Sequence, residues 1–381
     1  MFKKISYIPF VTEYLKEKIK VTNANSIIWL GAYPYFKLFH YIFGTLGITD
    51  VRLMDNQKEK QGELVDGVKV EAVDVNPVNV KHTLFVMHNT HEAEFIKQLA
   101  EYGVSTERII NLRPLLLNWK RERENELLAG CRHLSLKEVQ TVELNTLKHF
   151  KNYCEKAGLR YFLAEGTLIG AVRHHGFIPW DDDIDVFMPF DDYLKLIKSF
   201  PDTDKYELHD WRKQDMYPFQ YAKLFDKETR MIHSGTRDTF GFLYMCVCID
   251  IFPMAGYPSD IREIQLKWRR NRELDTIREE WNRMQELEDL REEDCRQAVT
   301  DEKYALSFDD SQMVGTMQTL GFDPWVVRKE AFAGTEYLRF EDEEFAVPRG
   351  YDEYLTVRYG DYMKLPAPEA RWIHRYPSYA I

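Results

Sequence analysis

The chain has 381 residues, which is long for one ordinary domain and predicts two or three. Its 51 Lys and Arg against 62 Asp and Glu give a net charge of −11, which argues against a general nucleic-acid-binding protein, because such proteins carry a basic face for phosphate contacts. Hydrophobic residues at 44% supply enough material for a core, so wholesale disorder is excluded. A local basic pocket for a small phosphorylated ligand stays compatible with this charge.

The cysteines and the N-terminus indicate the compartment. The five cysteines are odd in number and lack CxxC spacing, so they indicate neither a disulfide framework nor a structural zinc site. The first twenty residues carry Lys3 and Lys4 but only a short apolar stretch, which argues against a signal peptide. We therefore expect a cytoplasmic protein.

Residues 1–118 are predicted to form an α/β module. Short apolar runs typical of buried strands alternate with segments of helical spacing: 26–30, 35–43, 51–54, 84–87 and 91–102. Strands that alternate with helices predict a parallel sheet with crossover connections, as in a Rossmann-like unit. The apolar stretch 26–48 is long enough for a membrane span, but Pro34, Lys37 and His40 interrupt it, which favours a strand, a turn and a helix.

Asp55 lies 24 positions after Gly31, a spacing like that of a dinucleotide-binding unit. Tyr33 and Phe36, however, stand where that fingerprint has glycines, and bulky side chains there keep the backbone away from a pyrophosphate. This difference argues against a dehydrogenase and favours a structural or docking role for the module over cofactor binding.

Residues 119–159 are rich in Arg, Lys, Glu and Leu and are predicted to be helices that connect two modules. Ser135 followed by Glu138 is a capping-box pattern that marks a helix start. Residues 160–381 are predicted to form a second domain with short strands. Within it, the charged segment 261–300 has few apolar positions and is predicted to be a solvated helical insertion.

An acidic cluster follows in residues 181–185. In an extended strand, the aliphatic side chains of Ile184, Val186 and Met188 face one side and the carboxylates of Asp181, Asp183 and Asp185 face the other, with Asp182 between them. Carboxylates this close repel one another unless a cation lies between them. Their hard oxygen atoms suit Mg²⁺ or Mn²⁺ rather than zinc. An isolated pattern of this kind also fits a solvated turn, because Asp and Pro179 are turn formers.

Two further features favour a functional site over a turn. Gly166 and Thr167 open a predicted strand-to-helix turn, whose backbone N–H groups can hold phosphate oxygens. Asp250 interrupts a strand in which Val247, Ile249 and Ile251 are predicted to be buried, and a charge in such a strand needs a partner or a metal ion. Asp250 is therefore the candidate third carboxylate.

Basic residues near these carboxylates are candidates for binding phosphate. Arg173 lies one helical turn beyond the glycine turn, and Lys223 lies in a predicted strand, so either can neutralise a phosphate or be an ordinary surface residue. His174 or His175 can shuttle protons, although a structural role is favoured for both. Packing in the core is favoured for Trp180, and Cys246 and Cys248 are expected to be small buried strand residues.

The segment from residue 166 to 185 resembles the LicD family, whose members include bacterial phosphocholine transferases and which is related to eukaryotic fukutin and fukutin-related proteins. The matching features occur in family order: the glycine turn, Arg173, the Pro179-Trp180 pair, the aspartate cluster, residues 249–253 and residues 359–366. The resemblance covers about residues 136–374 and leaves residues 1–118 without a counterpart.

This resemblance implies a nucleotidyltransferase-like domain, with a short mixed sheet flanked by helices and carboxylates around Mg²⁺. Thr167 stands where the wider superfamily usually has Ser, so the hydroxyl is kept. Family members move a phospho-substituent from a CDP-activated alcohol to a hydroxyl of a glycan, and cell-surface glycans such as teichoic acids, capsule or lipooligosaccharide are the usual acceptors.

We expect Asp183, Asp185 and Asp250 to hold Mg²⁺, or Mn²⁺ in its place, against the donor diphosphate. Gly166, Thr167, Arg173 and Lys223 are expected to orient the diphosphate. Asp181 or Asp182 is the candidate acceptor for the proton of the attacking hydroxyl.

Two other functions stay open at this point. A nucleotidyltransferase would use the same carboxylates and release pyrophosphate, whereas a noncatalytic nucleotide-binding protein would need no metal ion. Lipid-linked glycan acceptors would bring the protein to the inner face of the membrane, and no nucleic-acid partner is expected.

Overall fold

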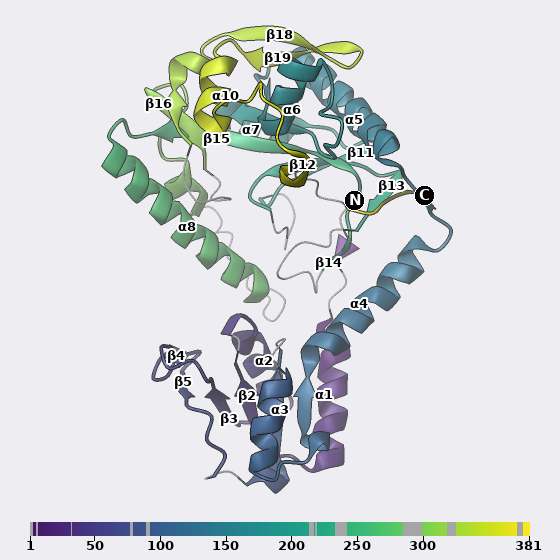
Figure 1. Cartoon of the computed structure of the whole chain (residues 1–381), viewed down its shortest axis with the longest axis vertical. Coiled ribbons are helices and arrows are strands. Elements are labelled where there is room, and N and C mark those ends of the chain that lie inside the picture. Colours follow the sequence, from purple (N-terminus) through teal and green to yellow (C-terminus); the bar gives the residue numbers. More distant parts are fainter. Residues whose placement is uncertain are drawn as a thin grey trace. The chain divides into compact units, whose positions relative to one another are not determined.

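A computed structural model of the whole chain is shown in Figure 1. It describes residues 3–4, 7–31, 33–76, 79–88, 92–212, 217, 219–232, 242–284, 299–317, 325–371 and 376–381. The chain divides into two compact units, one built mainly of Lys4–Ala129 and the other of Gly130–Ser234 and Tyr244–Ile381. The predicted connector, residues 119–159, contains the end of one helix and all of the next, and these helices belong to different units.

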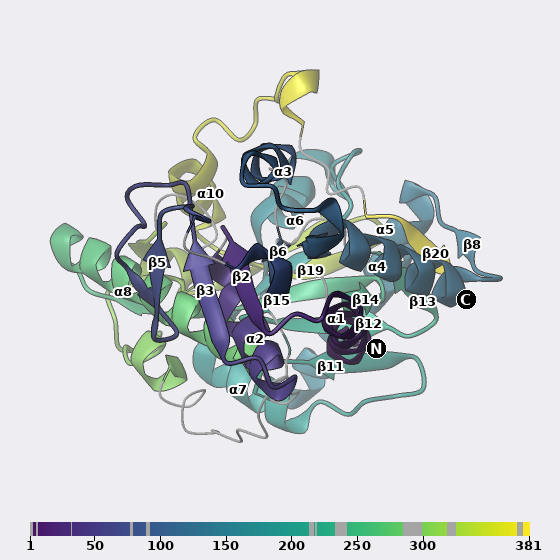
Figure 2. The same cartoon turned by 90° about the horizontal axis from the view of Figure 1, so that it is seen from below.

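The first unit contains a six-stranded sheet. Its order is β4 (Leu64–Val65), β5 (Val68–Glu71), β3 (Asp50–Met54), β2 (Ser26–Leu30), β6 (Thr83–Met87) and β7 (Ile109–Asn111). All neighbouring pairs are parallel except β4 with β5, and β3, β2 and β6 lie side by side in Figure 2. The parallel sheet that the alternating pattern predicted is therefore present.

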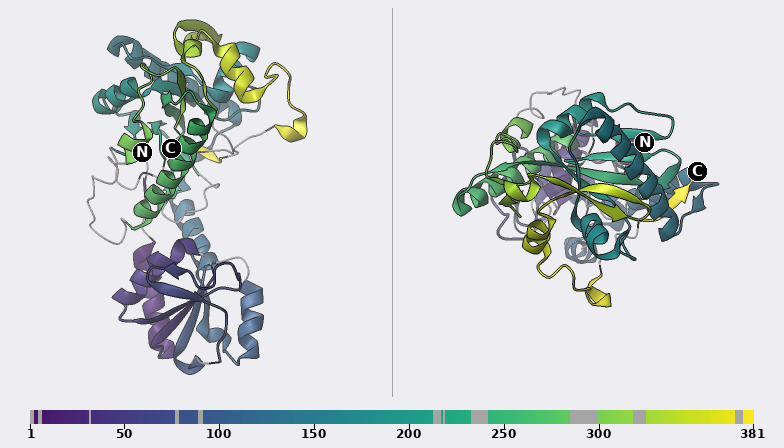
Figure 3. Two further views of the ribbon diagram at one scale, coloured as in Figure 1. Left: turned by 90° about the vertical axis from the view of Figure 1, so that its left-hand side faces the viewer. Right: turned by 90° about the horizontal axis from the view of Figure 1, so that it is seen from above.

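Helices lie on both sides of this sheet (Figure 3). They are α1 (Ile8–Thr22), α2 (Tyr33–Thr45), α3 (Glu92–Glu101) and α4 (Leu112–Leu128), with the short 3₁₀ turns η1 (Val80–His82) and η2 (Thr106–Arg108). The stretch that had the apolarity of a membrane span is β2 followed by α2, as the sequence favoured. The predicted helix 91–102 matches α3, and its first residue, His91, lies outside the described residues.

Phe36 explains why the first turn departs from a dinucleotide-binding pattern. Its ring is fully buried and meets the ring of Trp29 edge to face, with 6.3 Å between the centroids. Trp29 also stacks on Phe39 at 5.0 Å. The bulky side chain at this glycine position therefore belongs to the core between β2 and α2.

The second unit begins with β8 (Arg132–His133) and α5 (Leu136–Ala157). The capping box predicted at Ser135 is confirmed: its hydroxyl accepts from the N–H of Glu138, and the Glu138 carboxylate accepts from the N–H of Ser135. Gly158 ends the helix in the left-handed conformation, at φ 65°.

Replacing Ser135 by Ala is expected to lower the unfolding free energy of this unit by about 1 kcal/mol, the usual cost of losing a helix cap. Urea denaturation followed by circular dichroism measures it. The matched control is Thr141→Ala in the same helix, whose hydroxyl bonds only to the carbonyl of Lys137, and which should cost nothing. Equal losses in both variants would contradict the capping role.

This cap also has a pH dependence. Hydrogen bonds from the backbone and hydroxyl of Ser135, together with Arg132, lower the pKa of Glu138 from 4.5 to about 2. Because the folded-state pKa is the lower one, the stabilisation is present above about pH 4.5 and is lost as the pH falls towards 2.

The main sheet of the second unit is mixed. Its central order is β11 (Tyr206–His209), β12 (Ala222–Asp226), β15 (Cys248–Tyr257), β10 (Asp185–Pro189) and β9 (Phe162–Leu163). The far end of β15 also pairs with β16 (Met313–Thr316), which pairs with β17 (Val327–Arg328). Only β10 and β15 run parallel to each other, as the resemblance implied for a mixed sheet.

The remaining elements surround this sheet. The helices are α6 (Glu165–Ile169), which continues as a π-helical turn η3 (Gly170–His174), then α7 (Phe190–Ser199), α8 (Ile261–Met284), η5 (Lys329–Phe332), α10 (Tyr351–Tyr359) and η6 (Pro368–Ala370). Small sheets are formed by β13 (Thr229–Met231) with β20 (Ser378–Ala380) and β8, and by β18 (Thr335–Phe340) with β19 (Glu343–Pro348). A further two-stranded sheet, β1 (Lys3–Lys4) with β14 (Phe242–Tyr244), consists of residues that are divided between the two units. The first part of the predicted charged insertion is α8; residues 285–298 lie outside the described residues.

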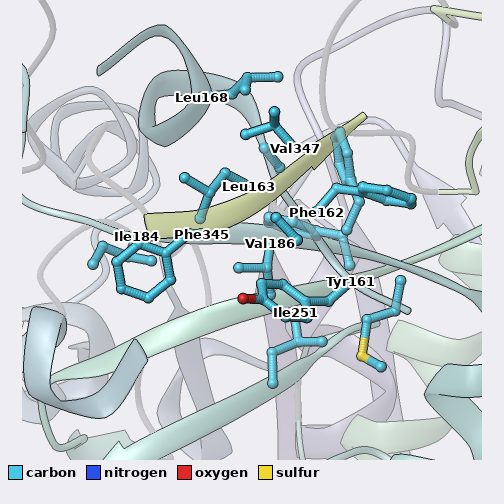
Figure 4. Packing of buried hydrophobic residues seen from close by; sticks show 14 of the residues in the cluster. Tyr161, Phe162, Leu163, Leu168, Ile184, Val186, Ile251, Phe345 and Val347 are labelled. Atoms are coloured by element: carbon cyan, nitrogen blue, oxygen red, sulfur yellow. The ribbon is translucent and has the colours of Figure 1, made fainter. Parts of the chain in front are cut away.

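The core of the second unit lies against β9, β10 and β15. Figure 4 shows Leu163, Val186 and Ile251 packed together, with Phe345 and Val347 of β19 beside them. Ile184, just before β10, belongs to the same cluster. The aliphatic side that the sequence predicted for this strand is therefore buried. In the described part of the chain, no helix has both the length and the apolarity of a membrane span.

Candidate active site

The site is built on the two parallel strands β10 and β15. Their register places Asp185 directly opposite Asp250, and the N–H of Asp250 donates to the carbonyl of Ile184 at 2.8 Å. Residues in register on neighbouring strands project from the same side of a sheet. The two carboxylates that the sequence assigned to separate strands are therefore neighbours.

The strand that carries Asp185 is shorter than the sequence predicted. β10 begins at Asp185, and residues 181–184 form an irregular segment in front of it. The N–H of Asp181 closes a turn onto the carbonyl of Ile178, and the carbonyl of Asp181 accepts from the amide of Gln140 on α5 at 2.9 Å. These bonds take Asp181 out of the strand ladder, so the carboxylates do not form one row along a strand.

The predicted glycine turn lies against this acidic segment. It follows β9 and opens α6, as expected for a strand-to-helix turn. A Cβ on Gly166 would come within 2.7 Å of a carboxylate oxygen of Asp181, so that carboxylate would have to shift if the turn carried a side chain here. The hydroxyl of Thr167 is buried and accepts from the N–H of Asp185 at 2.9 Å. Thr167 therefore fixes the start of β10.

Lys223 lies within the carboxylate cluster. It is opposite Asp250 in the antiparallel register of β12 and β15, and its ammonium pairs with Oδ1 of Asp250. The ammonium also lies 4.6 Å from the ring centroid of Phe219 and 5.1 Å from that of Tyr221. Burial alone would lower the pKa of Lys223, but Asp250 and the neighbouring thiol and phenols outweigh it and raise this pKa.

The cluster has a strong effect on the titration of Asp185. Burial first, and then the charges of Asp183 and Asp250, raise the pKa of Asp185 well above its ordinary value. Asp183 is two residues before Asp185 in the chain, and Asp250 is its partner in the sheet.

Arg173 points to a different part of the unit. Its guanidinium donates to the backbone carbonyl of Tyr362, with a longer contact of 3.4 Å to that of Lys364. Burial lowers the pKa of Arg173 and also that of His174. Arg173 therefore joins the glycine turn to the C-terminal segment, and its predicted contact with substrate stays a prediction.

The other residues that the sequence singled out have packing roles. Trp180 packs partly against the core, and the guanidinium of Arg371 covers its ring at 4.2 Å. Cys246 and Cys248 are buried, as expected for strand residues, and the thiol of Cys248 lies 3.8 Å from Oδ1 of Asp250.

Sequence reasoning missed two acidic residues beside the predicted site. Glu143 is buried on α5, and Glu165 begins α6 directly before the glycine turn. The carboxylate of Glu165 accepts from Arg358 at 3.1 Å and from the hydroxyl of Tyr359, both on α10. The spacing of polar residues on the inner side of α5, where Gln140 and Glu143 are one turn apart, was the available signal for Glu143.

The donor chemistry of the cluster suits a hard divalent cation, because every acidic group in it offers carboxylate oxygens. In the part of the chain that the structure describes, however, no three His, Cys, Asp or Glu side chains come together closely enough to hold a metal ion by themselves. Magnesium is usually bound by one or two carboxylates together with substrate phosphates. Asp185 and Asp250 fit that mode of binding.

Known proteins place this unit in a family. Residues 158–282 match the family model for the LicD/FKTN/FKRP nucleotidyltransferase domain. The lipopolysaccharide cholinephosphotransferase LicD of Haemophilus influenzae is 33% identical over 261 residues, which cover 63% of this chain and 96% of that protein. The chain belongs to the LicD family. The resemblance that the motifs indicated is thus confirmed.

Two further relatives match over shorter segments. The ribitol 5-phosphate transferase FKRP, from human and from mouse, is 43% identical over 47 residues, which are 12% of this chain and 10% of that protein. An uncharacterised Rickettsia prowazekii protein, RP689, is 32% identical over 78 residues, or 20% of this chain and 27% of its own length.

Proposed function

We propose that the second unit is a transferase that moves a phospho-alcohol group, such as phosphocholine, from a CDP-activated donor to a hydroxyl of a cell-surface glycan, with release of CMP. The observation that carries this proposal is the placement of Asp185 beside Asp250, in a chain that matches a cholinephosphotransferase along nearly the whole length of that protein. The FKRP match supports the transfer of a phospho-alcohol group, because that relative is named a ribitol 5-phosphate transferase.

A divalent cation, Mg²⁺ or Mn²⁺, fits the proposal. Asp185 and Asp250 would hold it together with donor phosphate oxygens, and Asp183 is proposed as a third ligand once the ion is bound. When bound, such an ion supplies positive charge that neutralises the diphosphate and stabilises the CMP leaving group.

The residues of the chain bind and orient the reactants. The ammonium of Lys223 has three donors, so it can keep its bond to Asp250 and also donate to a phosphate oxygen. Thr167 holds the backbone of Asp185, which fixes the direction of that carboxylate. Asp181 or Asp182 accepts the proton from the acceptor hydroxyl, whose oxygen forms the new bond to phosphorus as the bond to the CMP oxygen breaks. Orientation and electrostatic stabilisation would account for most of the rate.

The test is to incubate the purified chain and Mg²⁺ with CDP-choline or CDP-ribitol and a glycan acceptor, and to identify the nucleotide product. We expect CMP, formed only with a divalent cation and faster with acceptor. Pyrophosphate, formed from a nucleoside triphosphate with the nucleotide left on the acceptor, would instead identify a nucleotidyltransferase. No turnover and no cation affinity would reject catalysis. A lipid-linked acceptor would bring the protein to the inner face of the membrane.

A further inference from the structure

Arg358, the last residue but one of α10, is bonded to the residue that precedes the glycine turn. Its Nε donates to the carboxylate of Glu165 at 3.1 Å, and its guanidinium lies 5.3 Å from the ring centroid of Tyr359. The hydroxyl of Tyr359 donates to the same carboxylate. The C-terminal motif 359–366, which the proposed mechanism does not use, therefore begins with a contact to the glycine turn.

Glu165 is held close to Asp185. The N–H of Ala164, on one side of Glu165, donates to the carbonyl of Asp185 at 3.0 Å. The hydroxyl of Thr167, on the other side, accepts from the N–H of Asp185 at 2.9 Å. Because residues on both sides of Glu165 are bonded to the backbone of Asp185, the guanidinium that Glu165 binds lies beside the carboxylate pair.

The backbone of Glu165 is strained. Its φ of 43° lies in the left-handed region, which is unfavourable for a residue with a Cβ. Such strain persists where the surrounding structure holds it in place, and it is concentrated at functional sites. The side chain of Glu165 is only 17% exposed, so its two bonds to α10 fix both the carboxylate and the guanidinium.

The guanidinium of Arg358 has donors available for a ligand. Among the described residues, only its Nε donates a hydrogen bond, whereas Nη1 and Nη2 donate none, and the side chain is 36% exposed. The two cations that the sequence proposed for phosphate differ from it. The ammonium of Lys223 is 7% exposed and pairs with Asp250, and Arg173 donates to the carbonyl of Tyr362.

We propose that Arg358 binds a phosphate group of the nucleoside diphosphate donor through Nη1 and Nη2, and that Glu165 is the positioning residue that fixes its guanidinium. The two amino groups match two oxygens of one phosphate, and such a charge-assisted pair is stronger than a neutral hydrogen bond. This inference rests on the proposed function for its donor. It adds a phosphate-binding cation from the helix that leads into the C-terminal motif.

The experiment measures the Kd of the full-length chain for CDP in Mg²⁺ by isothermal titration calorimetry, and for cytidine by competition with CDP. We expect Arg358→Gln to weaken CDP binding at least about tenfold and to leave cytidine binding unchanged, because cytidine has no phosphate. Arg358→Lys keeps the charge without the paired amino groups, so its affinity for CDP should lie between those of wild type and Arg358→Gln.

The matched control is Arg328→Gln. The guanidinium of Arg328 also bonds to a glutamate through Nε at 3.1 Å, here Glu353 of α10, but its side chain is 67% exposed and its partner is not part of the glycine turn. This variant should bind CDP as wild type does.

A second comparison covers loss of stability in Arg358→Gln, where the carboxylate of Glu165 is left without its cation. Glu165→Gln alone and the double variant Glu165→Gln, Arg358→Gln have no such unpaired carboxylate. The double variant should bind CDP at least about tenfold more weakly than Glu165→Gln. Equal affinities of these two variants for CDP would overturn the inference.

The outcomes separate this inference from the proposed function. Unchanged CDP affinity in Arg358→Gln would overturn the inference, even if the wild type releases CMP. Equal weakening of CDP and cytidine binding in the double variant would show that the ion pair only maintains the fold, and it would also overturn the inference. CDP binding that depends on Arg358, in a chain that releases no CMP from any CDP-alcohol, would support the inference and reject the proposed function.

Discussion

Replacing Asp185 by Asn is expected to slow metal-dependent release of CMP by more than about 10²-fold. Loss of a residue that only supports a metal ligand typically costs ten- to a hundredfold, and Asp185 is proposed as a ligand itself. Asn has the same shape and keeps the backbone N–H that donates to Thr167, so the start of β10 should be unchanged. The measurement is the rate of CMP release at saturating donor and Mg²⁺.

Stability should change in the opposite direction to activity. Burial and the charges of Asp183 and Asp250 raise the pKa of Asp185, which means that the ionised carboxylate destabilises the fold. Replacing this carboxylate by a neutral amide should therefore raise the melting temperature of the metal-free protein. A variant that loses activity because it unfolds would instead melt at a lower temperature than wild type.

The matched control is Asp226→Asn. Asp226 is the last residue of β12, at the opposite end of that strand from Lys223. Asp226 is also a buried aspartate of the same sheet, but it pairs with Lys205 and accepts from the N–H of Glu228. This variant should release CMP at nearly the normal rate. If Asp185→Asn also retained nearly normal activity, the carboxylate pair would not be the catalytic centre.

Local patterns in the sequence predicted the elements of the site well. A period of two identified Ile184 and Val186 as buried, and the charge inside an apolar strand marked Asp250 as a residue with a partner. Both inferences depend only on residues that are close together in the sequence, and not on which strands lie side by side. They were correct because a run of aliphatic residues tends to be buried wherever it lies, although Ile184 precedes β10 and that strand is buried on both of its faces.

The partners themselves could not be predicted, because they depend on strand order and register. Nothing near Lys223 in the sequence shows that β12 lies beside β15, so its pairing with Asp250 appears only in the fold. Arg173 was assigned to phosphate because it follows the glycine turn, but its guanidinium bonds to carbonyls about 190 residues away in the sequence. Glu143 was missed because an acidic residue within a charged amphipathic helix is ordinarily exposed.

Replacing Lys223 by Met is expected to lower the unfolding free energy by about 3–5 kcal/mol, because it leaves the carboxylate of Asp250 without its cation. The side chains of this pair are only 7% and 15% exposed, so water cannot take the place of the ammonium. Urea denaturation measures the loss. The control is Lys137→Met, which removes an ammonium that is 72% exposed and lies 3.7 Å from the carboxylate of Glu341, and which should cost less than about 1 kcal/mol.

A double-mutant cycle separates the ion pair from the packing of the lysine chain. Asn in place of Asp250 removes the unpaired charge, so the combined variant Lys223→Met, Asp250→Asn should be more stable than Lys223→Met alone. If the combined variant were no more stable, the loss would come from the hydrocarbon part of Lys223 against Phe219 and Tyr221. Mg²⁺ should restore part of the stability of Lys223→Met and little of the combined variant, because only the former keeps the carboxylate that binds the ion in place of the ammonium.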